Sequence, residues 1–450
     1  MTFSQAAEEH LDDVYGYLSW FTGDRAAAED LTGVARMRST AKLPGFKPSD
    51  WPILAAGKVR HAGEPIAMAI GSTPAEAEDI AGLVEVDFEA LRPVVTMADA
   101  LKKTPPFVHD DWGDNILVDI KLEGGDLAGA KANAVHIVER TFRMNRMHPL
   151  ALEGRACLAH YDSRLDELVV HVAHQLPVPL QIGLSQVLGI SQRRLRVIVP
   201  DVGASFGLKT YVESETVAVA WAAMKLRRPV RWIQDRYESL VCDANCRDYQ
   251  CKIIGYADAS GRVLGLECDV VVDSGAYSPW PWPAGIEGGL ALGNIQGCYD
   301  IRALRGRAIN VVSNKPAGQP FRGVARPLSC IGHEIVMDGI AEMVGIDPVE
   351  ARAYSLGANS LARLGEREHS RQWSEQSVAL APNDPVILYN AACNLAQLGE
   401  HDRALDRLER SIEAGVAVGD WIKHDPDFEN LRDHPRFQAI VKRIAPTQVR

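Results

Sequence analysis

The apolar residues of the central chain change repeatedly between a strand-like and a helix-like period, and this pattern restricts the fold more than any other feature. Residues 58–70 (KVRHAGEPIAMAI) run apolar like a pair of strands around Gly63, and residues 83–88 (LVEVDF) alternate strictly. Between them, residues 74–82 (PAEAEDIAG) have a helical pattern that opens with a proline. The order strand, helix, strand predicts an α/β unit.

The same alternation continues further along the chain. It predicts strands at residues 135–145, 167–174 and 194–199, helices at 178–188 and 215–226, and a hairpin at 251–273 that turns at 259–261. Residues 111–126 are polar and contain three glycines, so we interpret them as a linker and a candidate domain boundary.

The first 36 residues predict a helical extension. Residues 4–34 have the spacing of two helices separated by a break at 22–24, with Asp24 as the N-cap of the second. Residues 12–32 (DDVYGYLSWFTGDRAAAEDLT) resemble the start of region 2 of an extracytoplasmic-function sigma factor. The helices of that family which grip polymerase and promoter do not follow, so the resemblance supports no role in transcription.

The last part of the chain carries an internal repeat. The letters LGE at residues 364–366 recur at 398–400, a separation of 34 positions. This is the period of a tetratricopeptide repeat, so residues 357–450 are predicted to be an all-α tail of helical repeats, closed by a cap at 421–444 and able to bind a protein partner. Small residues and a proline at the flanks agree with that period: Ala358, Ala392, Ala404 and Pro382.

Composition limits the classes of function. The formal net charge is −11, with 59 acidic against 48 basic residues, which argues against sequence-independent binding of nucleic acid. The chain starts with acidic residues and no signal-peptide pattern, and it has no apolar run of about 18 residues, so we expect a cytoplasmic protein without a membrane span. None of the eight cysteines forms a C-x-x-C pair, and no metal-ligand cluster is predicted.

Two stretches at predicted strand ends carry candidate binding residues. Gln175 follows the strand ELVVHVAH, where an amide can donate and accept at a fixed point. The loop at residues 201–209 (DVGASFGLK) lies between a strand and a helix, and Gly203 and Gly207 would let its backbone N–H groups approach an anion or a pterin edge.

Two further stretches complete the candidate set. Residues 273–277 (DSGAY) close the long hairpin, and residues 315–327 (KPAGQPFRGVARP) form a loop that presents Arg322 and Arg326. An arginine can hold a phosphate or carboxylate with its two-pronged fork, although each of these arginines, taken singly, is more typical of a surface ion pair.

In their order, the motifs of residues 37–356 resemble the large subunit of molybdenum hydroxylases of the xanthine dehydrogenase/aldehyde oxidase family, in its carbon-monoxide-dehydrogenase-like branch. GEPIAMAI and AEAEDIAGLVEVDFEALRPVV resemble the hammerhead domain, which gives an α/β domain at 37–108. A first molybdopterin-binding α/β domain then spans 109–356. Its motifs are VERTFRMNRMHPLALEGRACLAHYD, PDVGASFGLK, RPVRWIQDRYESL, VVVDSGAYS and FRGVARP.

This resemblance implies a molybdopterin cofactor with molybdenum, commonly in the cytosine dinucleotide form. Gln175 matches the glutamine that binds a molybdenum ligand, Phe206 and Gly207 match the loop beside the metal, and Arg322 matches an arginine of the active-site loop. The metal is held by pterin sulfurs in such enzymes, so no protein ligand is expected. The resemblance also implies hydroxylation at carbon and electron transfer to iron–sulfur and flavin subunits.

The chain also departs from the family pattern. Ala204 and Ser205 interrupt the glycine run G-G-G-F-G, and Thr210 replaces the substrate-binding glutamate of xanthine-oxidising members, which argues against a purine. No residue matches the family's glutamate base, so the catalytic residue stays unassigned. Three hypotheses remain. The chain is an active subunit, alone or completed by a second chain; or a non-catalytic protein whose helical repeats bind a protein partner; or a fusion or chimera of unrelated fragments without a settled function.

Overall fold

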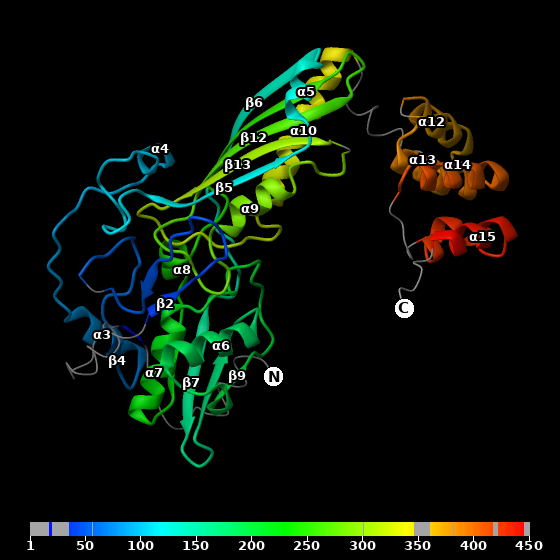
Figure 1. Cartoon of the computed structure of the whole chain (residues 1–450). Helices are drawn as coiled ribbons and strands as arrows, with labels where there is room; N and C mark the ends of the chain where they lie inside the picture. Colours follow the sequence, from blue (N-terminus) through cyan, green and yellow to red (C-terminus); the bar gives the residue numbers. More distant parts are fainter. Residues whose placement is uncertain are drawn as a thin grey trace, which may run out of the picture. The chain divides into compact units, whose positions relative to one another are not determined.

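The computed structural model of the chain describes residues 18–19, 36–55, 57–299, 301–345, 361–380, 382–416 and 422–444. The chain divides into two compact units (Figure 1). The first contains the chain up to Asp258 together with Arg262–Val336, and the second contains Ala259–Gly261 and the chain from Met337 onward. Among the described helices, none combines the length and hydropathy that a membrane span requires.

A five-stranded sheet forms one part of the first unit (Figure 1). Strands β12 and β13 run parallel, and the other neighbouring pairs are antiparallel. In spatial order the strands are β5 (Ile116–Gly124), β13 (Ala303–Val311), β12 (Val263–Asp273), β11 (Tyr249–Ala257) and β6 (His136–Met144). The predicted strand at 135–145 and the predicted hairpin at 251–273 are therefore confirmed.

Helices cover both faces of this sheet. Gly306 faces Leu292 of α9 (Ile286–Gly293), and Gly332 of α10 (Arg326–Val344) faces Ile253 on the same side of the sheet. The Cα of Gly265 faces α5 (Leu127–Ala132) on the opposite face. The alternation along β12 explains this, because successive side chains of a strand point to opposite faces.

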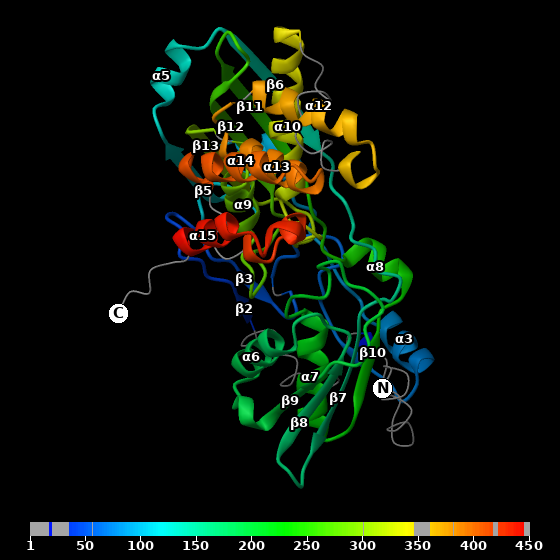
Figure 2. The same cartoon turned by 90° about the vertical axis from the view of Figure 1, so that its right-hand side faces the viewer.

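The second sheet of the first unit has four strands, which Figure 2 shows side by side. β8 and β9 run parallel and are joined through α6 (Pro177–Leu188), a right-sized crossover for a βαβ unit. Helix α7 (Ser214–Leu226) packs against the sheet with nine buried residues, so the two predicted helices are confirmed. In spatial order the strands are β10 (Val230–Ile233), β7 (Ala156–Asp162), β8 (Glu167–Val172) and β9 (Leu195–Ile198).

The segment before residue 108 contains short elements. Helix α3 (Pro74–Gly82) has the predicted bounds, because the Thr73 side chain accepts a hydrogen bond from the Glu76 N–H at 3.2 Å and Pro74 opens the first turn. The remaining elements are β1 (Leu18–Ser19), β2 (Arg36–Arg38), β3 (Asp50–Pro52), β4 (Ala69–Ile70) and α4 (Met97–Ala100).

Four sequence predictions for the first unit are wrong. In residues 58–70 only β4 is a strand, and it pairs with β1 at Leu18–Ser19, where a helix was predicted; the rest of the predicted helix pair at 4–34 lies outside the described residues. Residues 83–88 pair with no described strand despite their alternation. The predicted linker at 111–126 contains β5, whose pairing with β13 overrides the local polarity.

A buried arginine ties the second sheet to its helices. Arg155 precedes β7 and donates two hydrogen bonds to Glu215, at 3.0 and 3.1 Å, and one to Asp243 at 2.9 Å. Its guanidinium also lies 3.3 Å from Glu213 and stacks 5.3 Å from the centre of the Trp232 ring. One cation therefore holds the start of α7 and the chain after α8 (Arg236–Cys242) in fixed positions.

The second unit is helical, as predicted for the tail. Asp384 caps α13 by accepting hydrogen bonds from the backbone N–H groups of Val386 and Ile387, both at 2.9 Å. Phe428 and Leu431 are fully buried against α13 and α14. The elements are α12 (Arg367–Leu380), α13 (Pro385–Gln397), α14 (His401–Glu413), the 3-10 helix η3 (Pro426–Leu431) and α15 (Pro435–Ile444).

The two LGE sequences form the same turn. Gly365 and Gly399 have φ angles of +83° and +76°, and in each turn the N–H of the following glutamate donates to a carbonyl five residues earlier, at 2.9 Å. Ala392 and Ala404 are fully buried, whereas Ala358 lies outside the described residues. This equivalence agrees with an internal repeat, and its tetratricopeptide type stays a prediction.

The buried acidic cluster around Arg155 predicts a pH effect on stability. Burial raises the pKa of the Glu213 carboxyl to about 7, with Arg155 opposing and Glu215 and Asp243 reinforcing the shift. The folded chain therefore keeps a proton on Glu213 where the unfolded chain loses it, so this group destabilises the fold as pH rises from about 5 to about 8. Glu213→Gln should lose that pH dependence in urea unfolding, whereas the exposed control Glu123→Gln should keep it. Identical pH profiles for wild type and Glu213→Gln would contradict this account.

The left-handed turns of the second unit predict that replacing their glycines by alanine lowers the local free energy of unfolding. No atom lies within 4 Å of a Cβ built on Gly399, so Gly399→Ala adds backbone strain without a collision and should destabilise α13 and α14 by about 1 kcal/mol. Hydrogen exchange of the full chain measures this loss. Gly293→Ala is the control, since Gly293 also has open space but no positive φ. Unchanged exchange in α13 and α14 would show that the turn tolerates a side chain.

Candidate cofactor site

The loop at 201–209 connects β9 to the segment before α7 and has an unusual backbone. Ala204 and Phe206 have φ angles of +77° and +57°, in the left-handed region that non-glycine residues rarely adopt, and Gly207 has a φ of +112°. The Phe206 side chain is 42% exposed. The loop therefore presents an aromatic ring to the surface on a constrained backbone.

This loop is locked to the loop at 315–327. The Arg322 N–H donates to the Phe206 carbonyl at 2.9 Å, and the Phe206 and Phe321 rings meet edge to face with centres 6.4 Å apart. A Cβ on Gly207 would lie 1.9 Å from the Pro320 carbonyl oxygen. Only glycine allows the two loops to approach this closely.

The chain around Gln175 joins the same loop from the other side. The Gln175 N–H donates to the Lys209 carbonyl at 2.7 Å. The His174 ring accepts a hydrogen bond from the Leu176 N–H at its Nδ1, so its Nε2 carries the proton and donates to the Tyr211 carbonyl at 2.9 Å. Three of the four predicted stretches, those of Gln175, Phe206 and Arg322, are therefore brought together.

The fourth stretch, 273–277, anchors the loop at 315–327 from behind. Lys315 Nζ lies 2.6 Å from an Asp273 carboxylate oxygen and 2.9 Å from one of Asp248. Burial lowers the pKa of Lys315, but the two carboxylates outweigh it and the pKa is raised. This stretch holds the loop in place and presents no side chain beside Phe206.

Gly203 makes its contacts within the chain. Its N–H donates to the Glu153 carboxylate, and a Cβ there would lie 2.7 Å from Glu153 Oε2. The N–H groups of Ser205, Phe206 and Gly207, in the middle of the loop, donate to no acceptor among the described residues. The predicted cofactor role of Gly203 therefore stays a prediction, carried by its place in the loop.

Gln175 and Arg322 keep their side chains available. Both residues are exposed, and neither the Gln175 amide nor the Arg322 guanidinium hydrogen-bonds to another described residue. An amide, a cation, an aromatic ring and free backbone N–H groups thus lie on three connected loops. These groups fit an anionic ring system with a phosphate, because the guanidinium and the N–H groups donate to anionic oxygens and the aromatic ring can contact a flat ring.

Sequence reasoning missed the residues that hold these loops. Arg247 donates to the carbonyls of Arg322, at 2.5 Å, and of Phe321, at 3.3 Å, and its guanidinium lies 4.5 Å from the centre of the Phe321 ring. Burial raises the pKa of the nearby Glu287 carboxyl to about 8, and Arg247 opposes that shift. No local pattern marks Arg247, since its partners lie 75 positions away.

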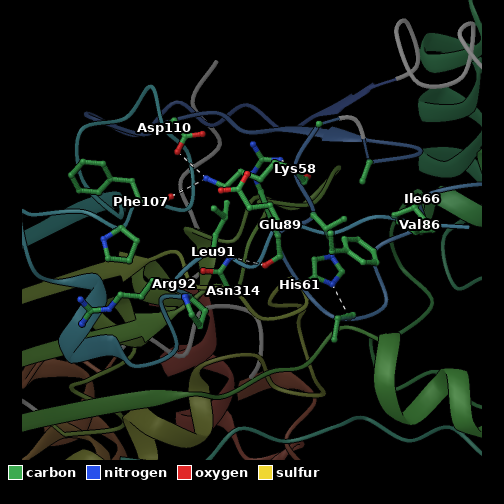
Figure 3. Close-up of a pocket in the computed structure, with 18 of the residues that line it drawn as sticks. Lys58, His61, Ile66, Val86, Glu89, Leu91, Arg92, Phe107, Asp110 and Asn314 are labelled. Carbon is green, nitrogen blue, oxygen red and sulfur yellow. Dashed lines mark hydrogen bonds and ion pairs between the residues drawn. The ribbon is translucent and has the colours of Figure 1, made fainter.

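Two other features do not belong to this site. A cavity of about 950 Å³ is lined by residues such as His61, Leu91 and Asp110, and by none from the three loops (Figure 3). The Lys58 ammonium that lines it is already paired with Asp110 at 2.8 Å. The cavity is therefore separate from the candidate cofactor site.

One cluster of possible metal ligands is found among the described residues, Cys393 with Asp425 and Asp427 in the second unit. Its carboxylates already have partners, since Tyr389 donates to Asp425 at 2.6 Å and Arg363 pairs with Asp427 at 2.7 Å. These contacts give the cluster a structural role in closing the second unit.

Comparison with known proteins identifies the family of the central chain. Residues 108–356, more than half of the chain, match the molybdopterin cofactor-binding domain. The large subunit of nicotine 6-hydroxylase from Paenarthrobacter nicotinovorans is 30% identical over 343 residues, which cover 73% of this chain and 42% of that protein. Quinoline 2-oxidoreductase from Pseudomonas putida 86 has a similar structure, with a TM-score of 0.70 and 26% identity over 78% of this chain and 48% of that one.

These relatives are more than twice as long as the part that matches. The large molybdopterin subunit of nicotinate dehydrogenase from Eubacterium barkeri differs, because its 27% identity over 344 residues covers 74% of this chain and 79% of that protein. The chain belongs to the molybdopterin cofactor-binding family, in the group of large subunits that includes xanthine dehydrogenase and carbon monoxide dehydrogenase.

Proposed function

We propose that the chain is the cofactor-binding subunit of a molybdenum-dependent oxidoreductase, completed by a second polypeptide. One observation carries the proposal: Gln175, Phe206 and Arg322 come from three loops that hydrogen bonds join, and their side chains remain exposed. An amide, an aromatic ring and a guanidinium on connected loops with a fixed backbone form the kind of preformed polar and apolar surface that binds a ligand.

The proposed holding groups follow from the geometry. The Gln175 amide and the N–H groups of Phe206 and Gly207 would bind polar atoms of a molybdopterin, and Arg322 would neutralise a phosphate or a second anionic group. The bound cofactor would supply the redox chemistry of hydroxylation at carbon. A cytosine dinucleotide form, the hammerhead domain at 37–108 and partners carrying iron–sulfur and flavin groups belong to the same proposal.

A completing polypeptide is supported by two observations. Leu152 is 91% exposed and Tyr237 is 77% exposed on the first unit, so these large side chains are available to pack against another polypeptide. A relative named as a large molybdopterin subunit is spanned to 79% by this chain, so a subunit of this size exists in the family. We propose that the second polypeptide supplies the glutamate base, for which the sequence offered no match.

An aromatic nitrogen heterocycle is the substrate class we propose. Relatives named for nicotine and quinoline share the fold and the sequence. Thr210 is buried and donates its hydroxyl to the Gly207 carbonyl at 2.8 Å, so no carboxylate stands at this position to bind a purine.

A non-catalytic role remains the second candidate, because the two equivalent turns of the helical unit favour a repeat that binds a protein partner. In that case, removal of residues 357–450 would abolish a protein contact and leave the molybdenum content at zero.

Molybdenum content tests the proposed function. The full chain, purified from a host that makes the cofactor, should hold about one molybdenum atom per chain when coexpressed with a polypeptide supplying the second half. Gly207→Ala should reduce this to background, because its Cβ would push the Pro320 loop away. Gly113→Ala is the matched control, since Gly113 has a φ of +71° but nothing within 4 Å. A folded wild-type chain without molybdenum under these conditions would rule the function out.

The interruption of the glycine run gives a second prediction. Ala204 has a φ of +77°, where a Cβ costs about 1 kcal/mol, so Ala204→Gly should stabilise the loop and raise the molybdenum content. Loop order is measured by hydrogen exchange of residues 203–209, with Ala173→Gly, at a buried position next to β8, as the destabilising control. If Ala204→Gly slows loop exchange but leaves the molybdenum content unchanged, the backbone strain does not limit cofactor binding. Faster loop exchange in this variant would show that Ala204 is not strained.

A further inference from the structure

One carboxylate contacts both ends of the candidate cofactor loop. At the start of the loop, Glu153 accepts a hydrogen bond from the Gly203 N–H, and its own N–H donates to the Gly203 carbonyl at 3.3 Å. At the end of the loop, Lys209 Nζ lies 3.3 Å from the same oxygen, Glu153 Oε2. A single oxygen therefore bridges two points of the loop on either side of Phe206.

Among the described residues, only Glu153 forms an ion pair with the Lys209 side chain. This side chain is 1% exposed. Burial lowers the pKa of this ammonium, and Glu153 counters the shift. The ammonium depends on Glu153, since an unpaired buried charge is costly.

Glu153 itself stands on a rigid base. It lies two residues before Arg155, whose guanidinium is fixed by Glu215 and Asp243. The close approach of Glu153 also explains why residue 203 is a glycine, because any side chain there would collide with the carboxylate. The anchor is thus built into the second sheet and reaches the loop from outside it.

We propose that Glu153, through Gly203 and Lys209, is a positioning residue that sets the conformation of the cofactor loop. The clamp holds the ends of the loop while Ala204 and Phe206 keep their left-handed conformations between them. Its purpose in cofactor binding rests on the proposed function, but its effect on the loop does not.

Hydrogen exchange of the full chain tests the clamp directly. The amides of Leu208 and Lys209 are hydrogen-bonded to Ser205 within the loop, at 2.9 Å each, and report its order. Glu153→Ala should speed their exchange about tenfold and leave β12 unchanged. Asp119→Ala is the control, because it removes a partly exposed carboxylate that pairs with Arg307 within the five-stranded sheet.

A conservative variant keeps the test decisive if Glu153→Ala does not fold. Glu153→Gln retains an acceptor for the Gly203 N–H but loses the charge facing Lys209, so exchange should rise at Lys209 and not at Ala204. Wild-type exchange rates at both Lys209 and Ala204 would overturn the positioning role. Faster exchange in β12 as well would also overturn it, because a purely structural residue would loosen the whole unit.

Molybdenum content of the same variants links the clamp to the cofactor. Folded Glu153→Ala should retain about a tenth of the wild-type metal, whereas Asp119→Ala should retain all of it. Wild-type metal content in Glu153→Ala, with a loosened loop, would overturn the link. A wild-type chain without metal would refute the proposed function, and loop exchange would still decide the clamp.

Discussion

The buried guanidinium of Arg155 is the contact on which the cofactor-site architecture depends. A cation removed from water is tolerated when several acceptors surround it, and here Glu215, Asp243 and Glu213 do so. Their backbones belong to the start of α7 and the chain after α8, while Arg155 introduces β7. The arginine thereby holds the segments that flank the loop at 201–209, and Glu153 extends this rigidity to the loop itself.

The glycines of the site serve packing between protein segments. Gly207 leaves room for the Pro320 carbonyl, and Gly203 leaves room for Glu153. Both loops are therefore fixed by contacts on their inner sides, which leaves Phe206 and Arg322 facing outward. The inner sides of the loops are thus packed against protein, and the Phe206 and Arg322 side chains stay free for the ligand of the proposed function.

Local patterns predicted the elements that complete their hydrogen bonds locally or against their sequence neighbours. Helix α7 and the β11–β12 hairpin appear where the sequence placed them. Residues 83–88 have the alternation of a strand but no described partner, and β5 looks polar but pairs with β13, 188 positions away at the Asp119–Arg307 contact. The motif residues Gln175, Phe206 and Arg322 were found by resemblance. Arg247 and Glu153 were not, because their roles exist only through contacts 75 and 50 positions distant.

Strain in the loop explains why it needs holding from both ends. Ala204 and Phe206 are two left-handed non-glycine residues within three positions, each costing about 1 kcal/mol against a relaxed backbone. A free loop would relax to ordinary φ angles and withdraw Phe206 from the Arg322 N–H. The hydrogen bond from Arg322 and the Glu153 oxygen oppose this relaxation at the middle and at the ends of the loop. The strained conformation persists because these contacts hold the loop at both ends and in the middle.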